Sequence, residues 1–527
     1  MDPDQHHLLV TNLMRGVLPG TESGQARLIE THISSVIVCD EVVYKLKKPV
    51  DLGFLDFSTL DKRHFFCNEE LRLNRRFSPQ LYLDVLPIFG TSGSPSLQAD
   101  GEVLDYTLRM KPFDQATQLD LMLDAGQLDA RMLASLAEFL AGFHLTAETA
   151  PTSSDFASPQ RVWAPVELNF RQVRGLVSDP ETDSLLDQVE QWSQGEFERH
   201  EPLFESRRAQ GFIRECHGDL HLRNLAWHDD APLLFDCIEF EPNLYWIDVI
   251  NDIAFLWMDL RYRDRPDLAA VLLNRYLERS GDYAGLALLR YYAVYRAMVR
   301  AKIAAISLSQ ATGPAAITAL RDELTAYLRL ALSISGEPQR AVYLMHGPSG
   351  SGKSYLANQV SGYLDALVIR SDAVRKQLFA GIDDAPQGTI NQGIYSADAS
   401  RKTYTRLQQM AEVITGAGYA VIVDATFNQL QYRAPFRRFA GERGLPLVVI
   451  DLHAPRAVLL ERVEQRRGDI SDADVRVLQH QLQGWKPLAD DELAQAITVD
   501  TAETLDYARL GHQIKAMASS MQPKKIA

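Results

Sequence analysis

Residues 347–354 read Gly-Pro-Ser-Gly-Ser-Gly-Lys-Ser and fit the pattern G-x-x-x-x-G-K-[ST] at every fixed position. The apolar run 341–346 before them predicts a strand, and a helical pattern follows them. Glycines in such a loop let backbone N–H groups turn inward around a phosphate, and the helix N-terminus adds positive potential. A lysine at the end of the loop can reach the β/γ-phosphate oxygens, and the hydroxyl after it can ligate Mg²⁺. The stretch therefore predicts a nucleotide-phosphate site made by Gly347, Ser349, Gly350, Ser351, Gly352, Lys353 and Ser354.

Apolar runs and helical stretches alternate after this loop. The runs lie at 366–369, 419–423 and 445–452, and the alternation predicts a parallel sheet with crossover helices. A Ser/Gly/Pro-rich stop at 333–338 ends a helix-rich stretch before the loop. We therefore expect a first domain at 1–335, a linker at 336–340, an α/β domain at 341–520 and a tail at 521–527.

Charged residues follow two of these predicted strands. Asp372 and Arg375 come just after 366–369, at the carboxyl end of a strand, where open α/β sheets bind ligands. Asp372 suits proton acceptance from a substrate hydroxyl and Arg375 suits an anionic group. A helix N-cap with a surface arginine is the alternative. Asp424 ends the run 419–423 in the Walker-B arrangement, which holds Mg²⁺ through water.

Arginines gather further along the chain. Arg433 and Arg437 are four residues apart, and Arg462, Arg466 and Arg467 precede Gly468-Asp469-Ile470-Ser471-Asp472-Ala473, a stretch resembling a mobile lid. A lid arginine would stabilise charge on a transferring phosphoryl group. Because Arg462 and Arg466 share a helix face, an ordinary salt-bridged helix surface is the alternative for them.

These motifs together resemble the small P-loop kinases that include polynucleotide 5′-hydroxyl kinases and gluconate kinases. The resemblance covers about 340–485 and rests on the glycine-rich loop, Ser371-Asp372-x-x-Arg375, Val423-Asp424-Ala425-Thr426-Phe427 and the arginines before Ser471. It implies an α/β P-loop kinase fold with a parallel sheet. The implied roles are nucleotide binding by Gly352, Lys353 and Ser354, a general base at Asp372, substrate contact by Arg375 and Arg433, and a lid arginine at Arg466.

A second motif lies in the first domain. Residues 217–224 read His-Gly-Asp-Leu-His-Leu-Arg-Asn, and Asp236 follows twelve residues after Asn224. This is the spacing of eukaryotic-type kinases, in which Asp219 orients and deprotonates the substrate hydroxyl while Asn224 and Asp236 hold Mg²⁺. His217 and His221 are expected to pack or to brace the loop. Elsewhere the pattern predicts a hairpin at 28–48 and helices at 61–77, 129–149 and most of 250–333.

The block H-G-D-x-H-x-x-N with its later aspartate closely resembles the aminoglycoside phosphotransferase and choline kinase superfamily, over roughly 25–330. Asp248 and Asp252 match that superfamily's downstream structural acids. The resemblance implies a protein-kinase-like α+β fold, with a small β-rich lobe and a large helical lobe. It also implies a nucleotide-binding lysine at Lys45, with Lys47 and Lys48 as competitors, and a helix glutamate paired with it at Glu70 or Glu69.

One departure concerns the phosphate-covering loop. Protein kinases use G-x-G-x-x-G there, whereas residues 30–35 read Glu-Thr-His-Ile-Ser-Ser without glycine. Members of the superfamily vary at this position, so an active site is favoured, and a pseudokinase is the alternative. A helical stretch with Tyr291, Tyr292, Tyr295, Arg296, Arg300 and Lys302 fits either a wall that contacts substrate or core tyrosines beside a basic stripe.

Composition narrows the functional class. The 527 residues carry 54 Lys and Arg against 69 Asp and Glu, a net charge of −15. Such acidity excludes a dedicated nucleic-acid coat or an anionic-membrane binder and leaves room for a local basic groove. Four cysteines without a C-x-x-C pair exclude a disulfide scaffold and a zinc knuckle. No signal peptide or membrane span is visible, so we expect a cytoplasmic protein.

The sequence thus predicts an enzyme with two ATP- and Mg²⁺-dependent phosphotransferase domains. Each would transfer a γ-phosphate to a hydroxyl of a small molecule, or of a nucleic-acid end in the case of the C-terminal domain. The alternative is one catalytic P-loop kinase, regulated by a pseudokinase-like N-terminal domain. No membrane partner is expected, and the sequence does not reveal the oligomeric state.

Overall fold

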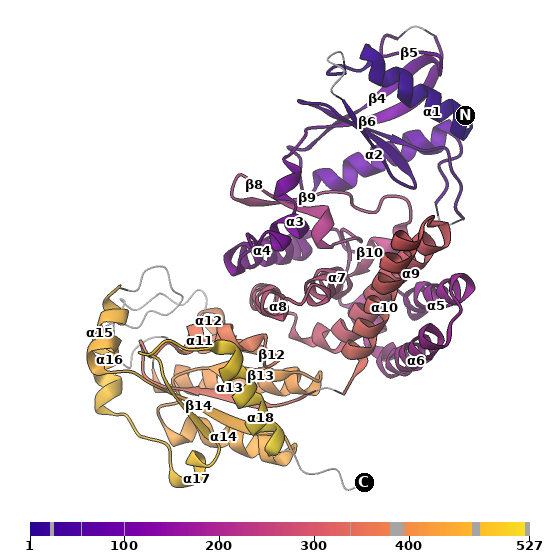
Figure 1. The fold of residues 1–527 in the computed structure, drawn as a ribbon. Helices are drawn as coiled ribbons and strands as arrows, with labels where there is room; N and C mark the ends of the chain where they lie inside the picture. Colours follow the sequence, from indigo (N-terminus) through magenta and orange to yellow (C-terminus); the bar gives the residue numbers. More distant parts are fainter. Residues whose placement is uncertain are drawn as a thin grey trace. The chain divides into compact units, whose positions relative to one another are not determined.

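The structure is a computed structural model, which describes residues 1–21, 26–53, 55–99, 101–337, 339–379, 394, 396–465 and 475–521. Contacts within the chain form two compact units (Figure 1). The first unit comprises Met1–Phe139, Phe143–Asp259 and Tyr295–Leu324. The second comprises Leu140–Gly142, Leu260–Val294 and Thr325–Ala527.

The division between the units does not follow the expected linker at 336–340. Helix α8 (Pro266–Ser280) belongs to the second unit. There the Asn274 Oδ1 atom accepts a 2.9 Å hydrogen bond from the Val368 N–H of β12 (Ala366–Arg370), the edge strand of that unit's sheet. A side chain thus satisfies a backbone donor that an uncovered edge would expose. Sequence pattern does not reveal this contact, because α8 reads as an ordinary amphipathic helix. Where independently folding modules begin and end stays a prediction.

The first unit contains a six-stranded antiparallel sheet with the strand order β1-β2-β3-β6-β4-β5. In its central hairpin, Ser34 lies opposite Lys47 and Val36 lies opposite Lys45, which confirms the predicted hairpin. The strands are β1 (Arg27–Glu30), β2 (Ser34–Val38), β3 (Val43–Lys47), β4 (Tyr82–Thr91), β5 (Ser94–Ser96) and β6 (Val103–Met110).

Two helices pack on this sheet. Helix α2 (Leu60–Arg75) contacts β4 and β6, and the Thr59 side chain caps it by accepting from the Lys62 N–H. Helix α1 (Pro3–Asn12) is capped by Asp2, and a π-helical turn (Leu13–Val17) follows it. Apolar side chains of this segment form one buried core with β2 and β3, which includes Leu9, Val10, Leu13, Ile37, Tyr44 and Leu46.

Most of the remaining first unit is helical, as the resemblance implies, although the sequence pattern predicted helices here only at 129–149 and from 250 onward. Its helices are α3 (Leu119–Asp124), α4 (Ala130–Thr146), α5 (Pro159–Leu176), α6 (Pro180–Ala209) and α7 (Val249–Tyr262). Two short antiparallel pairs frame the catalytic-loop motif, namely β7 (Ile213–Glu215) with β10 (Trp246–Asp248) and β8 (Leu225–His228) with β9 (Ala231–Leu234). Helices α9 (Leu286–Gln310) and α10 (Pro314–Ser335) contribute residues to both units, and residues 140–142 of α4 and 260–262 of α7 also belong to the second unit.

The second unit contains a five-stranded parallel sheet with the order β12-β13-β11-β14-β15. Besides β12, its strands are β11 (Val342–His346), β13 (Ala420–Asp424), β14 (Leu447–His453) and β15 (Ala496–Asp500). The first four strands occupy the predicted apolar runs, and every residue of β11 and β13 is buried, as expected for parallel strands covered on both faces. Strand β15 was not predicted, because its residues Ala-Ile-Thr-Val-Asp are mostly exposed or only partly buried and form no continuous apolar run.

Helices connect these strands and confirm the α/β class. They are α11 (Lys353–Ser361), α12 (Ser371–Leu378), α13 (Ala397–Gly416), α14 (Leu430–Glu442), α15 (Arg456–Gln465), α16 (Val475–Gln483), α17 (Asp490–Leu493) and α18 (Tyr507–Ser520). None of the described helices is long and apolar enough to cross a membrane. The four cysteines are buried free thiols.

Candidate active sites

The catalytic-loop motif of the first unit brings Asp219 and Asn224 into direct contact. The Asn224 Nδ2 atom donates to the Asp219 carboxylate at 2.9 Å and to the Asp219 carbonyl at 3.0 Å. The His221 Nε2 atom lies 3.3 Å from the same carboxylate. Burial alone would raise the pKa of Asp219, but the neighbouring His221 outweighs it and the pKa lies below its ordinary value. Asp219 is therefore an ionised acceptor at neutral pH.

His217 braces the loop and is not placed as a base. Its Nδ1 atom accepts from the Asp219 N–H at 3.3 Å, and its Nε2 atom lies 3.0 Å from the Phe235 carbonyl, to which it donates. Both ring nitrogens are thus engaged by backbone groups in the neutral Nε2–H tautomer. Burial lowers the pKa of His217, which agrees with that form.

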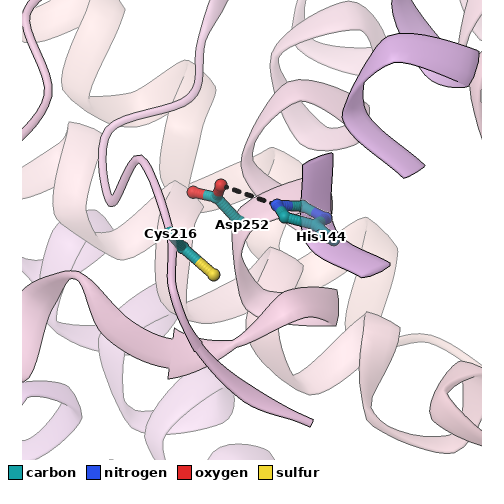
Figure 2. Close-up of side chains that lie close together, drawn as sticks. All are labelled: His144, Cys216 and Asp252. Carbon is teal, nitrogen blue, oxygen red and sulfur yellow. Dashed lines mark hydrogen bonds and ion pairs between the residues drawn. The ribbon is translucent and has the colours of Figure 1, made fainter. Parts of the chain in front are cut away.

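Asp252 anchors the same loop from helix α7 (Figure 2). Its Oδ1 atom accepts from the Gly218 N–H at 2.9 Å, and its Oδ2 atom accepts from the His217 N–H at 3.1 Å. His144 on α4 places its Nε2 atom 3.2 Å from Oδ2, the contact drawn in Figure 2. Gly218 has a φ of +83°, and a Cβ there would lie 2.6 Å from the Leu244 carbonyl oxygen. The loop therefore needs glycine at that position.

His144, Cys216 and Asp252 also form the one group among the described residues whose ligand atoms would suit a metal ion, with all three within 4.8 Å of one another. However, both Asp252 oxygens already accept backbone N–H bonds. Burial raises the pKa of the Cys216 thiol well above its ordinary value, and its Sγ atom contacts the Ile247 carbonyl at 3.6 Å. The cluster is therefore a brace for the catalytic loop.

Further buried ion pairs and hydrogen bonds hold this region. Arg207 pairs with Asp248 through two contacts of 2.6 and 2.8 Å, which fits the structural part expected for Asp248. Arg296 is buried and donates to the Gly218 carbonyl at 2.8 Å and to Asn251 at 2.8 Å. Tyr291, Tyr292 and Tyr295 are also buried. This stretch of α9 therefore favours the interpretation as core tyrosines, with Arg296 as a loop brace.

The ion-pair cluster on β3 and α2 contains the expected lysine and glutamate. The Lys45 Nζ atom lies 2.7 Å from Glu70 Oε1 and 2.6 Å from Asp236 Oδ1. Lys47 is also bonded to Glu70, at 2.8 Å, and contacts Glu239. Burial alone would lower the pKa of Lys45, but these carboxylates outweigh it and raise the pKa. Burial acts against ionised Glu70 as well, yet the two lysines hold its pKa down at about 2.

The contacts of this cluster separate Glu70 from Glu69 and set Lys48 apart, while Lys47 bonds Glu70 as Lys45 does, so the nucleotide-binding role of Lys45 stays a prediction. Glu70 is buried between the two lysines, whereas Glu69 pairs with Arg72 at the surface. Lys48 contacts Glu30 and the Thr31 carbonyl instead of the cluster. The sequence did not single out Glu239 as a partner of Lys47. A carboxylate three residues after Asp236 was the only signal for it.

Asp236 occupies a strained backbone position that its surroundings enforce. Its φ is +63°, a left-handed conformation that is uncommon for residues other than glycine. Its N–H donates to the Tyr82 hydroxyl at 3.0 Å, and the Cys237 N–H donates to Asn74 Oδ1 at 3.0 Å. Its carboxylate is half exposed. These contacts aim an accessible carboxylate at Lys45, in the way that a ligand site requires.

The glycine-rich loop of the second unit has the conformation that its sequence predicts. Gly350 and Gly352 have φ values of +81° and +85°, and a Cβ at Gly350 would lie 2.7 Å from the Leu459 carbonyl oxygen. The Lys353 Nζ atom folds back and donates to the Gly347 and Pro348 carbonyls at 2.9 Å each. Helix α11 begins at Lys353, so its N-terminus faces the loop.

A cavity of about 220 Å³ opens beside this loop. Its lining contains Ser349, Gly350, Gly352, Lys353 and Ser354 of the loop, together with Asp372 and Arg375 of helix α12 and Asp424 at the end of β13. Arg370, Ser371, Tyr404, Thr426 and Gln481 complete much of its polar wall. The structure thus brings together most of the residues that the sequence selects in this domain.

Asp424 lines this cavity and is almost fully buried. Burial raises its pKa, although Lys353 and a hydrogen bond with the Ser354 hydroxyl act in the opposite direction. Arg370 Nε is 3.8 Å from its carboxylate. A buried carboxylate with a raised pKa, next to the nucleotide loop, is a site where a bound cation would compensate the cost of burying charge.

Three predicted arginines have different placements. Arg375 is buried at the cavity wall, and its guanidinium donates to the Ile394 carbonyl at 2.9 Å. Arg433 was expected to contact substrate, but it is buried away from the cavity lining. Two contacts of 2.7 and 2.6 Å join it to Glu492, and a further bond reaches the Phe427 carbonyl. Its charge is thus satisfied inside the protein. Arg466 lies outside the described residues.

Arg462 takes a part that the sequence did not predict. Its guanidinium donates to the Thr501 carbonyl at 2.6 Å and to the Thr501 hydroxyl at 3.0 Å. That hydroxyl donates in turn to the Ser351 carbonyl at 3.0 Å. Thr501 follows β15, so the last strand and helix α15 together support the back of the glycine-rich loop.

Comparison with known proteins agrees with this geometry. A family model described as a phosphotransferase enzyme family matches residues 67–289, and one described as an AAA domain matches 342–488. Uncharacterized proteins from Mycobacterium tuberculosis and Mycobacterium bovis are 31% identical over 463 residues, which covers 87% of this chain and 90% of each relative. The chain belongs to their family. The two matches and the site geometry identify it as an ATP-dependent kinase with two kinase-like domains.

Several solved structures are similar to parts of this kinase. A choline kinase from Cryptosporidium parvum is 14% identical and covers 62% of this chain and 95% of its own, with a TM-score of 0.39. A sugar kinase from Janibacter sp. is 21% identical and covers 35% of this chain and 99% of its own, with a TM-score of 0.29. At such values the fold assignment rests on strand order and the family models.

Both sites offer oxygen donors that suit Mg²⁺. In the first unit, Asn224 is oriented by its bond to Asp219, and the Asp236 carboxylate is accessible. In the second unit, Asp424 adjoins the Ser354 hydroxyl. Carboxylate, amide and hydroxyl oxygens are the ligands that Mg²⁺ prefers. The residues present therefore fit the cation that kinases of this kind use with ATP.

Proposed function

We propose that this kinase has two working phosphotransferase sites, one in each unit. Each would use Mg²⁺ and ATP and would transfer the γ-phosphate to a hydroxyl of a small molecule. For the second unit, a nucleic-acid end is a further acceptor class. The observation that carries the proposal is that the first unit brings its predicted kinase residues into two contact groups, Asn224 with Asp219 and Lys45 with Glu70 and Asp236, while most of those of the second unit line one cavity.

In the first unit the proposed division of labour follows from the contacts. Lys45, held by Glu70, would bind nucleotide phosphates, while Asn224 and Asp236 would hold Mg²⁺. Asp219 would orient the acceptor hydroxyl. Because its pKa is lowered, Asp219 is a weak base. This suits a reaction whose loose transition state needs positioning and charge neutralisation more than early proton removal.

In the second unit the glycine-rich loop and Lys353 would bind the phosphates, and Ser354 and Asp424 would hold Mg²⁺. When bound, this cation would neutralise charge on the phosphate oxygens at either site. Asp372 and Arg375 line the same cavity, so Asp372 would accept the hydroxyl proton and Arg375 would bind an anionic group of the acceptor. The role of lid arginine that the resemblance implies for Arg466 stays a prediction.

One observation favours a second candidate, in which the first unit is a nucleotide sensor that regulates the second. The loop between β1 and β2 contains no glycine, so its backbone amides are less able to approach the phosphates closely. In this case the first unit would bind ATP without hydroxyl-dependent turnover.

The deciding experiment measures transfer from γ-labelled ATP to sugars, amino alcohols, aminoglycosides and 5′-hydroxyl oligonucleotides. Asp219→Asn and Lys353→Ala are compared with the exposed controls Asp229→Asn and Lys402→Ala. Two working sites predict that each site variant removes a different product while the controls remove none. If Asp219→Asn changes nothing and Lys353→Ala abolishes all transfer, the sensor candidate replaces the proposal.

A further inference from the structure

We propose that His6 of α1 is a positioning residue for the first nucleotide site. It would hold the glycine-free loop at residues 31–33, between β1 and β2, through the Ser35 hydroxyl. The inference rests on the proposed function, because it takes this loop to be the one that covers the nucleotide phosphates. It accounts for how a loop without glycine keeps a defined shape.

A continuous set of contacts runs from the helix to the loop. The His6 Nε2 atom lies 3.0 Å from the Ser35 hydroxyl, and that hydroxyl lies 3.2 Å from Glu30 Oε2. Glu30 pairs with Lys48, whose Nζ atom also donates to the Thr31 carbonyl at 2.6 Å. The contacts therefore begin on α1 and end on the backbone of the loop itself.

The available protons fix the direction of these bonds. Ser35 has one hydroxyl proton, which it donates to the Glu30 carboxylate, so its oxygen must accept from His6. His6 is consequently the Nε2–H tautomer, with a bare Nδ1 that has no hydrogen-bond partner among the described residues. Burial lowers the pKa of His6 to about 4 although Glu30 opposes this. His6 is therefore a neutral donor at physiological pH, in agreement with the geometry.

The helix is fixed firmly enough to act as an anchor. Its N-terminus has a reciprocal capping box, in which Asp2 and Gln5 each accept from the other's backbone N–H. Leu9 and Val10 lie in the buried core beneath the sheet. His6 itself is only 4% exposed. A buried donor on a capped, packed helix constrains its acceptor more than an exposed one would.

The loop depends on side chains for its shape. The Thr31 hydroxyl accepts from the Ser34 N–H at 2.9 Å, and the Thr31 N–H donates to the Ser34 carbonyl at 2.9 Å. The Lys48 N–H donates to the Ile33 carbonyl at 2.8 Å. In the β2–β3 register, Ser35 lies one position from the residue opposite Lys45. Movement at Ser35 would thus reach both the loop and the strand that carries the phosphate-binding lysine.

The test uses the full-length chain with Lys353→Ala to silence the second site, and measures MgATP binding by calorimetry. His6→Ala is expected to raise the dissociation constant about three- to tenfold, the loss expected for one buried hydrogen bond. His6→Gln, which can still donate to Ser35, should remain within about twofold of the parent. The control His7→Ala, on the exposed side of the same helix, should change nothing.

Ser35→Ala keeps the test decisive if His6→Ala fails to fold. It should weaken binding by a similar factor, and combining it with His6→Ala should add little, because both remove the same connection. An unchanged dissociation constant in Ser35→Ala, or equal weakening in His6→Gln and His6→Ala, would overturn the inference.

Failure of the proposed function gives a different result. In that case the parent itself would not bind MgATP at the first site. Amide hydrogen exchange at residues 31–34 then tests the brace directly. Faster exchange in His6→Ala but not in His7→Ala would support it, and unchanged exchange in both would overturn it.

Discussion

The two nucleotide sites differ in how their residues are spread along the chain and in the interactions that hold them in place. In the second unit, a contiguous stretch of eight residues makes the phosphate loop, and glycine backbone conformations define it. In the first unit, Lys45, Glu70, Asp219 and Asp236 come from distant parts of the chain, and buried ion pairs hold the lysine in place. Substitutions that remove charge should therefore harm the first site most, whereas substitutions that add a Cβ should harm the second.

The largest effect is expected for Glu70→Gln. The change leaves Lys45 and Lys47 buried beside a neutral side chain, and breaking a buried ion pair in this way costs about 3–5 kcal/mol. Product formation at the first site should also be lost. Urea unfolding followed by tryptophan fluorescence reports mainly on the first unit, because Trp485 is the one tryptophan beyond it. The control Glu69→Gln, which affects only a surface pair, should cost less than about 1 kcal/mol. Equal losses in the two variants would contradict the central place of Glu70.

A comparable cost is expected for Arg433→Met in the second unit, where a buried ion pair is present away from the cavity. Glu492 would be left unpaired and buried, at a cost of about 3–5 kcal/mol. The KM values of ATP and acceptor at the second site should change little in the protein that folds. Hydrogen exchange of β13 and β14 measures the stability, and Arg437→Ala, which removes a more exposed pair with Asp491, is the control. A rise in the acceptor KM alone would instead support the substrate contact that the sequence predicts for Arg433.

Acid should weaken the first unit through the same cluster. The pKa of Glu70 falls from its ordinary value of about 4.5 to about 2 on folding. A carboxyl with a lowered pKa contributes stability above the unfolded pKa and loses it as pH falls through the folded one. Between pH 4.5 and 2 the unit should therefore lose about 3 kcal/mol from this group. Urea midpoints measured across that range should fall less steeply in Glu70→Gln than in the wild type. Parallel slopes would show that Glu70 titrates normally.

The sequence predicted the second site better than the first, for the same physical reason. The motif 347–354 is local, and the other residues follow from strand topology and the helix after it: Asp424 ends β13, and Asp372 and Arg375 lie on α12 directly after β12. The choice between Glu70 and Glu69 depends on which side of α2 faces the core. Lys45 and Lys47 lie on the same face of β3 and both bond Glu70, so the choice between them depends on the contact of Lys45 with Asp236. Composition and spacing do not determine that. Arg433 shows the limit most clearly, because its partner Glu492 lies 59 residues away on a short helix.

Some of the fold was also beyond pattern recognition. The two units share α9 and α10, and α8 covers the edge of the parallel sheet although it precedes the expected linker. Helical periodicity reveals that such a helix has an apolar face, but it does not reveal which partner covers that face.

A smaller effect is expected for Gly350→Ala. Gly350 has a φ of +81°, and an added Cβ would lie only 2.7 Å from the Leu459 carbonyl oxygen. The substitution should therefore displace the loop and lower the stability of the unit by about 1–3 kcal/mol. The KM for ATP at the second site should rise with it, while the first site is unaffected. Gly352→Ala has a similar φ but no atom closer than 3.9 Å, so it isolates backbone strain from collision. If Gly352→Ala is the more damaging variant, close approach of the phosphate governs the loop, and collision with α15 does not.

The smallest effect is expected for His144→Phe. Asp252 would lose one donor but keep the two backbone N–H groups of His217 and Gly218. The free energy that holds the catalytic loop in place should therefore fall by about 1 kcal/mol. The kcat of the first site should fall several-fold while that of the second site is unchanged, and His200→Phe on α6 should leave both unchanged.

His144→Phe also distinguishes a brace from a metal centre. Purified wild-type protein should carry no stoichiometric zinc, and a chelator should not reproduce the variant. Zinc that is bound by the wild type and lost in His144→Phe would instead make the cluster in Figure 2 a metal site.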